Sequence, residues 1–251
     1  MSGFSRAEKA QLQASIRAGD LHKIKSIINS TASPYVPDPL TVDTIQYIRS
    51  QLIDDSELFL KGYPVVSLNR RGHQQERLLL ITSQAFYHVK YDYLTHSIEH
   101  FKRFPLSIVS HIYWGHLCDD FTSPPPRGSL TKRSALTYGV QVFFKPDHPD
   151  SPSDLSNIRT YIPLLPSTVP DGSSQAVAEE ITAPFEGSLV FLSKNSIMEH
   201  TFLPAGIVVQ HEISKPSGGI VSFVYNGLKL GFFKKNINNS PLPPSPRIVH
   251  E

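Results

Sequence analysis

Cys118 is the only cysteine of the chain, and by type it is the residue best suited to nucleophilic chemistry. Cysteine-dependent phosphoryl transfer needs a thiolate, which a phosphate-cradling loop and an arginine six residues later stabilise. The sixth residue after Cys118 is Pro124, and two aspartates, Asp119 and Asp120, directly follow the sulfur. Neighbouring carboxylates raise the pKa of a thiol because they disfavour its charged form. The sequence therefore predicts no catalytic residues and a protein that is not an enzyme.

Four residues of metal-ligand type stand close together in the sequence: His111, His116, Cys118 and Asp119. In an extended strand, residues 111 and 116 point to opposite faces. A structural zinc site needs four ligands in a closed tetrahedron, and no second cluster along the chain supplies the missing ones. We interpret these residues as polar positions at a strand end, and we predict no metal and no other cofactor.

Basic residues flank a polar turn at 69–75, namely Lys61, Arg70, Arg71 and Arg77. A phosphate group needs several convergent charge-assisted donors, and a loop between two strands can supply them. Lys132–Arg133 and Lys234–Lys235 could extend the same basic surface. Solvated Lys and Arg are also ordinary residues of any turn, which is the competing interpretation. The four residues around the turn are our candidate site for a lipid headgroup.

The elements that position these residues are indicated by apolar periodicity between residues 76 and 115. The run 78–81 is apolar on both parities, as in a strand covered on both faces. In 87–91 and again in 108–114, apolar residues alternate with polar ones. Three such runs at short intervals predict strands of a small antiparallel β-domain.

The same reasoning predicts further strands on both sides of this segment. Asn226–Gly227 is a strong two-residue hairpin signal between the predicted strands at 219–225 and 228–234. Prolines forbid ladder donation in the connection at 122–133, so that segment is a loop. The additional strand regions are 59–68, 138–144, 158–164, 206–213, 219–225 and 228–234.

Helical spacing of apolar residues predicts helices over 5–29, from about 41 to 52, and near 184–198. Gly19–Asp20 should break the first stretch, with Asp20 capping its second half. The segment 166–176 is polar and reads as a connection. Neither N-terminal helix is apolar enough to stand alone. Docking on the β-domain is the favoured arrangement, and docking on a partner is the alternative.

This order of elements predicts an α+β, mainly β protein: a PH-like antiparallel β-sandwich or partly open barrel with flanking helices. An eight-stranded lipocalin-like barrel fits the placement of helices and long loops less well. We expect an N-terminal helical segment at 1–55 that docks on the core, a PH-like domain at 56–235, and a proline-rich disordered tail at 236–251.

Bulk composition narrows the classes of partner. A net charge of +2 provides no strong field for nucleic acid, so we predict no nucleic-acid partner. No stretch approaches the ~20 apolar residues of a membrane span, and we expect no signal peptide. One cysteine fits a reducing compartment. These features predict a cytoplasmic protein whose membrane contact, if it has any, is peripheral.

Several short motifs resemble a known family. The run from Arg77 to Gly115 resembles the homology domain that follows the catalytic unit of Sac-type inositol phosphatases, which is also the core of the TPRG (Mover-like) family. A second group of matches near the C-terminus, in the same order, resembles the closing hairpin of that family. The resemblance covers about residues 40 to 235. The motifs that carry it are 76–82 (ERLLLIT), 90–92 (KYD), 113–115 (YWG), 130–133 (LTKR), 219–226 (GIVSFVYN) and 229–232 (KLGF).

The resemblance implies a non-catalytic, PH-like domain that associates with itself and with membranes or scaffold proteins. It further implies a vesicle or endosomal membrane as the place of peripheral contact. Residues 122–128 and the tail after 235 depart from the family pattern. The proline-rich tail carries a PxxP pattern, which suits SH3-type grooves but also arises by chance.

Self-association has a second basis in the closing strands. The segments 221–225 and 228–233 are apolar on both parities, so both of their faces must be covered. A helix of the same chain or a second copy of the chain could cover them. Trp114 is either a core residue or an interface anchor. We predict a homo-oligomer whose contact residues are Trp114, Phe223, Tyr225 and Phe232.

We therefore expect a non-enzymatic adaptor or regulatory protein that self-associates through a PH-like domain and binds a membrane surface, a phosphoinositide or a scaffold protein. The competing class is a phosphoinositide-handling enzyme or its regulatory subunit. A barrel for a small ligand is a third class, which would require an enclosed apolar cavity.

Overall fold

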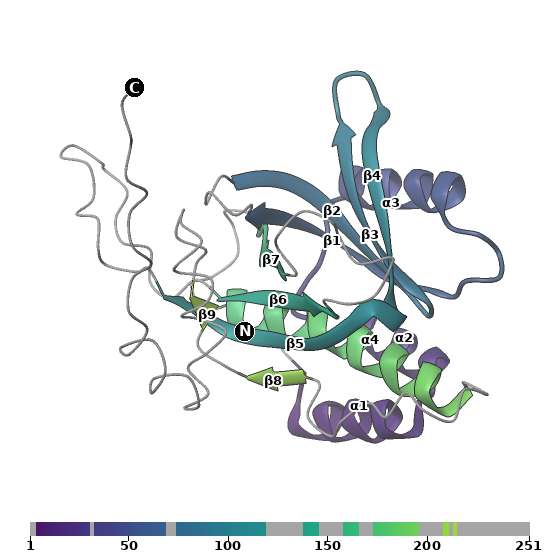
Figure 1. Ribbon diagram of the computed structural model, residues 1–251, viewed down its shortest axis with the longest axis vertical. Helices are drawn as coiled ribbons and strands as arrows, with labels where there is room; N and C mark the ends of the chain where they lie inside the picture. The colour runs from purple at the N-terminus through teal and green to yellow at the C-terminus, as the bar shows by residue number, and fades with distance from the viewer. Residues whose placement is uncertain are drawn as a thin grey trace, which may run out of the picture.

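The computed structural model describes residues 4–30, 33–68, 74–118, 138–145, 158–165, 173–195, 208–210 and 213–214. Four helices and nine strands are assigned within these ranges (Figure 1). In chain order they are α1 (Arg6–Ala18), α2 (Leu21–Ile28), α3 (Pro39–Leu52), β1 (Phe59–Leu68), β2 (Gln74–Thr82), β3 (Ala85–Asp92), β4 (Ser97–Pro105), a 3-10 turn (Leu106–Ile108), β5 (Val109–Cys118), β6 (Tyr138–Phe144), β7 (Ile158–Pro163), α4 (Ser173–Asn195), β8 (Val208–Gln210) and β9 (Ile213–Ser214).

Strands β1 to β7 form two antiparallel meanders that join through their outer members. The order along the sheet is β4-β3-β2-β1-β7-β6-β5-β8, and β9 also pairs with β5. The junction is the antiparallel pair of β1 and β7, where Val65 lies opposite Pro163 and Leu68 opposite Thr160. Among the described residues, β4 and β8 stand at opposite ends of this order and do not pair with each other. The sheet is therefore a partly open barrel.

A four-stranded meander, a three-stranded meander and a following helix make up a PH-like arrangement. Helix α4 lies along β5 and β6, while α3 lies on the opposite side of the first meander (Figure 1). The predicted fold class is confirmed by this topology.

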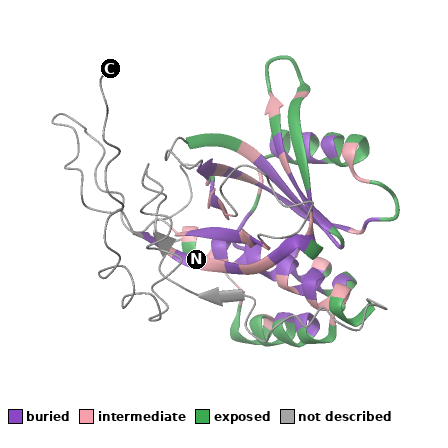
Figure 2. Ribbon diagram, viewed as in Figure 1, coloured by how far each residue is buried: buried purple, intermediate pink, exposed green. Residues whose placement is uncertain are grey.

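The main core lies between the inner face of the sheet and α4, as the buried residues in Figure 2 show. The Phe86 ring stacks on Phe104 at 5.0 Å between centroids and meets Phe185 of α4 edge-on at 5.3 Å. Helices α1 and α2 extend this core through residues such as Ile16 and Ile24. The N-terminal helices therefore pack on the domain and share its core.

A second, smaller core lies on the outer face of the first meander. Ile45 and Ile48 of α3 pack there with Leu78, Leu80 and Val89. Because apolar residues of β2 face both cores, the run 78–81 is apolar on both parities, as the sequence indicates. This arrangement fixes α3 across β1, β2 and β3.

Helix boundaries follow the local chemistry at the N-terminus. Gly19 adopts a left-handed conformation at φ 69°, and the Asp20 side chain accepts a hydrogen bond from the Lys23 amide. The predicted break and cap are confirmed. Helix α3 begins at Pro39, and Asp38 caps it by accepting from the Thr41 amide.

Two predictions about elements were wrong. Helix α4 begins at Ser173, so part of the segment 166–176 is helical and the helix starts before 184. Val177, Ile181 and Phe185 form its buried stripe, and Pro184 lies inside it. Strand β4 was not predicted, because Phe104 is its one buried residue and no alternation marks it.

The remaining strand predictions fall near or beyond the C-terminal limit of the described residues. Strand β8 lies inside the predicted region 206–213, β9 begins at its last residue, and both pair in parallel with β5. The regions 219–225 and 228–234, with the predicted hairpin at Asn226–Gly227, lie outside the described residues. The proposed tail from 236 onward lies outside them as well.

Candidate functional site

Strand pairing brings the start of β7 beside the connection between β1 and β2. Leu68, the last residue of β1, pairs with Gln74 on one side and with Thr160 on the other. The β3–β4 turn belongs to the same end of the first meander, because the strands alternate in direction. We call the basic side chains gathered on the inner face near this end the barrel-end cluster: Arg77, His88, His100, Lys102 and Arg159.

Pairing accounts for their common face. His88 lies directly opposite Lys102 on β4 and opposite Leu79 on β2. Arg77 lies two residues before Leu79 and so shares its face, as His100 does with Lys102. The cluster thus draws on strands that are distant in sequence.

His88 occupies the centre of the barrel-end cluster. Its Nδ1 lies 3.4 Å from the Tyr161 hydroxyl, and the two rings are tilted by 66°. Burial first, and then the positive charges of Arg77, Arg159, Lys102 and His100, together lower the pKa of His88 to about 3. His88 is therefore neutral at pH 7, and it is surrounded by groups that carry or can acquire positive charge.

The two arginines are held by neighbouring groups. Arg77 donates from Nη1 to the Glu76 carbonyl and from Nη2 to Gln75 Oε1, each at 2.6 Å. Burial lowers the pKa of Arg77, and the charge of Glu99 opposes that effect. The Arg159 guanidinium lies 5.9 Å from the centre of the Phe104 ring. Fixed guanidinium groups lose little freedom when they bind an anion.

Acidic side chains near the cluster have partners of their own. Glu99 forms an ion pair with Lys90. Asp92 accepts hydrogen bonds from the Leu94 amide and the Thr95 hydroxyl, both at 2.8 Å, and so shapes the β3–β4 turn. Its pKa is lowered first by the Thr95 hydrogen bond. Glu99 nevertheless acts on Arg77, so the positive charge of the cluster is reduced at that residue.

The structure does not bring the four residues predicted for a headgroup site together. Arg77 belongs to the barrel-end cluster, whereas Arg70 and Arg71 lie outside the described residues. Lys61 lies toward the other end of β1, opposite Ile81, and is buried. Its Nζ donates to Glu180 Oε1 at 2.7 Å, to Ser33 Oγ at 2.8 Å and to the Ile28 carbonyl. A headgroup contact by Lys61 would require this network to break.

Sequence reasoning missed most of the cluster. Lys102 lies on the strand that was not predicted, and Arg159 reaches the first meander only through the pairing of β1 with β7. One usable signal was present, since His88 occupies a polar position of an alternating run. The strand order needed to place the others could not be derived from that run.

The predicted contact residues for self-association are only partly described. Trp114 lies on β5, is partly buried and packs against the main core. Phe223, Tyr225 and Phe232 lie outside the described residues. The self-association residues therefore remain a prediction.

The histidines considered for zinc are occupied by ring contacts. His111 stacks on Phe143 with 4.1 Å between ring centroids, and His116 meets Tyr138 edge-on. Across the part of the chain that the structure describes, no three His, Cys, Asp or Glu side chains gather as a metal site would require. Within the same ranges, no helix is long and apolar enough to cross a membrane.

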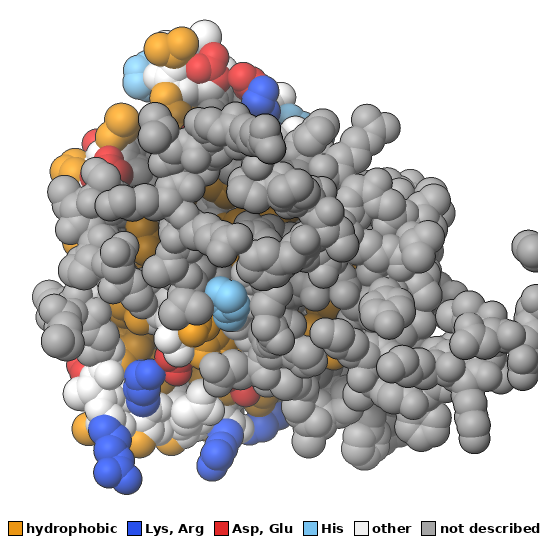
Figure 3. Space-filling view, turned by 90° about the vertical axis from the view of Figure 1, so that its left-hand side faces the viewer, with side chains coloured by type: hydrophobic (Ala, Val, Ile, Leu, Met, Phe, Trp, Pro, Cys, Tyr) orange, Lys and Arg blue, Asp and Glu red, His pale blue; other side chains and the backbone are white. Residues whose placement is uncertain are grey.

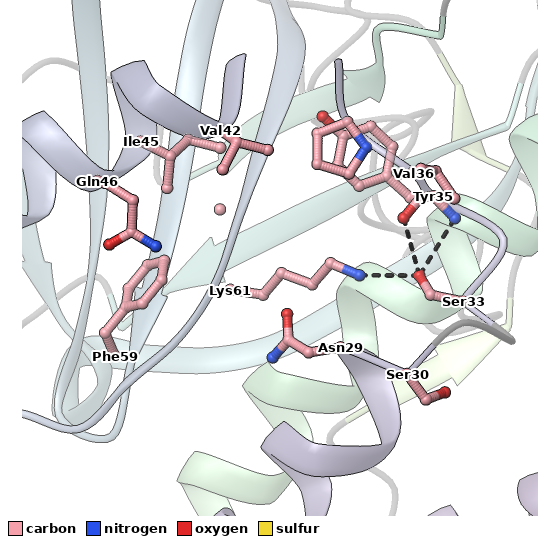
Figure 4. Close-up of a pocket in the computed structure, with 12 residues that line it drawn as sticks. Asn29, Ser30, Ser33, Tyr35, Val36, Val42, Ile45, Gln46, Phe59 and Lys61 are labelled. Carbon is pink, nitrogen blue, oxygen red and sulfur yellow. Dashed lines mark hydrogen bonds between the residues drawn. The ribbon is translucent and has the colours of Figure 1, made fainter. Parts of the chain in front are cut away.

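A cavity of about 440 Å³ lies between α3, the segment that precedes it and the first half of β1 (Figure 4). The Lys61 stem crosses its floor, and its ammonium group points toward Ser33. Beneath the cavity, Tyr63 donates to Glu180 Oε1 at 3.0 Å, and Ser33 donates to Glu180 Oε2. Burial lowers the pKa of Lys61, and the charge of Glu180 opposes this. The network joins β1, α4 and the segment at 33–35.

Together, the fold and the barrel-end cluster define a PH-like α+β domain with a basic inner face at one end of its sheet. The family model hSac2, described as an inositol phosphatase, matches residues 40–145. The match spans α3 and strands β1 to β6, and it is to the hSac2 domain rather than to a catalytic phosphatase domain.

Several solved structures are similar to the chain, among them the following two. The hSac2 domain from human phosphoinositide phosphatase Sac2 is 16% identical, with a TM-score of 0.43; the similarity covers 71% of this chain and 92% of that chain. A structure of Vav1 inhibited by an allosteric inhibitor is 9% identical, with a TM-score of 0.33, covering 72% of this chain and 45% of that one. No curated protein sequence matches the chain significantly.

Proposed function

We propose that this chain is a non-enzymatic adaptor whose PH-like domain binds a phosphate-bearing headgroup at the barrel-end cluster. The observation that carries the proposal is that strand pairing places Arg77, Lys102 and Arg159 on the inner face with His88, whose pKa their charges lower. Charge-assisted N–H donors from several strands can bind several phosphate oxygens at once. A neutral imidazole at the centre adds a hydrogen-bonding group without adding repulsion between cations.

The chemical class of the ligand is suggested by the family match. Residues 40–145 include Arg77, His88, His100 and Lys102, and the matching model is described as an inositol phosphatase. We therefore infer an inositol phosphate group, carried by a phosphoinositide in a membrane. A place on vesicle or endosomal membranes and membership of the narrower TPRG (Mover-like) family are part of the same proposal.

Self-association through the PH-like domain completes the proposed adaptor. Its support is the apolar character of the segments 221–225 and 228–233 and the family resemblance of the sequence. Sedimentation velocity at tens of micromolar tests it, and a strict monomer would remove this part of the proposal.

The alternative is a phosphoinositide-handling enzyme, which the description of the matched family model favours. Against it, Cys118 is followed by two aspartates, and no arginine stands six residues later. Phosphate release from a panel of phosphoinositides separates the two classes. Phosphate release by the parent that is lost in Cys118→Ser would show that the protein is an enzyme and not a non-enzymatic adaptor.

Headgroup binding is tested by calorimetric titration of the full chain with soluble inositol trisphosphate. Lys102→Gln and Arg159→Gln should each weaken binding by about ten-fold or more, because each removes a charge-assisted contact. Lys23→Gln is the matched control, since it makes the same charge change on exposed α2. Equal affinity of all three variants would remove the barrel-end cluster from consideration.

A further inference from the structure

Two adjoining hollows follow the line between α2 and α3 over the first residues of β1. One is the cavity of about 440 Å³ shown in Figure 4, and the other measures about 410 Å³. Asn29, Gln46 and Phe59 line both of them. The two hollows therefore form one continuous depression, which we call the α2–α3 groove.

One half of the α2–α3 groove is cationic. The Lys25 ammonium lies 6.0 Å from the centre of the Phe59 ring, and the Arg49 guanidinium lies 5.5 Å from the same centre. Burial lowers the pKa of Lys25, and the positive charge of Arg49 lowers it further. His22 lines this half as well. Two cations are thus held over one aromatic ring at a cost in mutual repulsion.

Acidic residues do not line this half within the described part of the chain. Asp54, Asp55 and Glu57 line a further hollow, which shares His22, Gln46, Arg49 and Phe59 with this half. Asp54 accepts from the Ser56 amide at 2.8 Å, and Glu57 pairs with Arg103 at 2.6 Å. Lys25 has no acidic neighbour in the lining of this half, so its charge, with that of Arg49 beside it, suits an anionic group supplied from outside the chain.

The other half of the groove is apolar. Tyr35, Val42, Ile45 and Phe59 line it, with the Lys61 stem as its floor (Figure 4). Val36 stands at its edge with 69% of its surface exposed. Apolar side chains exposed around a concave surface favour a ligand that carries apolar groups of its own.

We propose that the α2–α3 groove binds a peptide segment of a partner protein in which acidic residues adjoin apolar ones. The carboxylates would pair with Lys25 and Arg49, while apolar side chains would enter the half lined by Val42 and Ile45. A concave site with both characters fits a peptide better than a flat bilayer surface, which would meet only its rim.

The proposal gives the adaptor part of the proposed function a partner of defined chemistry. The groove is separate from the barrel-end cluster, since Phe59 begins β1 and Leu68, at its other end, adjoins the start of β7. The same molecule can therefore hold a headgroup and a peptide at once. A variant that abolishes binding at one site should leave binding at the other site unchanged.

The test is a selection of random dodecapeptides displayed on phage against the full chain, followed by anisotropy titration of the consensus peptide. We expect peptides that combine Asp or Glu with aromatic or branched apolar residues. The double variant Lys25→Gln with Arg49→Gln should weaken binding by about ten-fold. Lys23→Gln with Arg6→Gln makes the same charge change on exposed positions and should leave the affinity unchanged.

Further measurements separate the possible outcomes. Val42→Ser should weaken binding of the consensus peptide and leave binding of inositol trisphosphate unchanged. This difference distinguishes the groove from the barrel-end cluster. All variants should keep the melting temperature of the parent within a few degrees, because the changed side chains are exposed or partly exposed. A consensus without acidic residues, or equal affinity of the two double variants, would overturn the proposal. If the double variant Lys25→Gln with Arg49→Gln loses binding to phosphatidylserine vesicles but keeps the peptide affinity of the parent, the groove binds a membrane instead.

Discussion

The Lys61 ammonium lies 2.7 Å from the Glu180 carboxylate, with 8% and 0% of the two side chains exposed. This pair joins β1 to α4 through the interior of the domain. In a buried ion pair, the free energy needed to remove both charges from water offsets much of their mutual attraction. Removing only one of the two partners leaves the other charge buried and unpaired.

The first prediction concerns this asymmetry. Glu180→Gln should lower the free energy of unfolding by about 3–5 kcal/mol, because it leaves the Lys61 charge without its counter-charge. Lys61→Met with Glu180→Leu should recover part of that loss, because neither charge is then buried while the Tyr63 and Ser33 hydroxyls still lose their acceptor. Denaturation in urea gives the three values. A double variant as unstable as Glu180→Gln alone would show that packing and the hydroxyl hydrogen bonds, and not charge, set the cost.

The second prediction is a pH dependence of stability that arises from His88. Its pKa is about 3 in the folded protein against an ordinary value of 6.5. Between these values the unfolded chain binds a proton that the folded protein does not, so acid favours unfolding. The stabilisation is complete above pH 6.5 and is lost as the pH falls toward 3, at about 1.4 kcal/mol per pH unit.

Urea unfolding at several values between pH 4.5 and 6.5 measures this slope above the range in which most carboxylates titrate. His88→Gln should reduce it, because that side chain has no proton to gain. His22→Gln is the matched control on an exposed helix position. Slopes that do not differ between the two variants would contradict the assignment to His88.

The third prediction concerns the tip of the β3–β4 hairpin, which projects from the top of the molecule in Figure 1. Leu94 has 93% of its surface exposed there. Seen from the side, the top of the molecule shows hydrophobic side chains beside basic, acidic and histidine ones (Figure 3). If the headgroup belongs to a membrane lipid, Leu94 is placed to enter the interfacial region of the bilayer.

Leu94→Ser should therefore weaken co-sedimentation with phosphoinositide liposomes by about ten-fold, with unchanged affinity for soluble inositol trisphosphate. Leu164→Ser is the control, because it makes the same change at an exposed leucine that lies beside Pro64 of β1 and outside the α2–α3 groove. Equal pelleting of both variants would indicate that the tip stays in water.

The sequence was informative where the chemistry is local. The cap at Asp20 and the alternation of β3 depend on neighbouring residues, so both could be predicted. The pairing of Lys61 could not, since its partner Glu180 lies 119 residues later and on a helix whose start was misplaced. The barrel-end cluster required the register between β1 and β7, which no local pattern specifies. Charged β4 shows the same limit, because an edge strand need not alternate.

The last prediction concerns the crossing of α2 and α4 at Gly187. A Cβ added there would overlap Cδ1 of Ile24, while the next atom of that side chain, Cγ1, lies at 3.7 Å. Alanine favours a helix over glycine by about 1 kcal/mol. In Gly187→Ala this gain is opposed by overpacking, which costs about 1–3 kcal/mol. The single variant should therefore be no more stable than the parent.

Ile24→Val removes Cδ1 and should by itself cost about 0.5–1.5 kcal/mol. In that background, Gly187→Ala meets Leu21 Cδ2 at 3.6 Å and Cγ1 of residue 24 at 3.7 Å, both ordinary van der Waals contacts, so the same substitution should become stabilising by up to about 1 kcal/mol. A double-mutant cycle in urea measures the coupling between the two positions. Additive effects would mean that Ile24 rotates away from α4 at no cost, and that close contact at Gly187 does not set the distance between the helices.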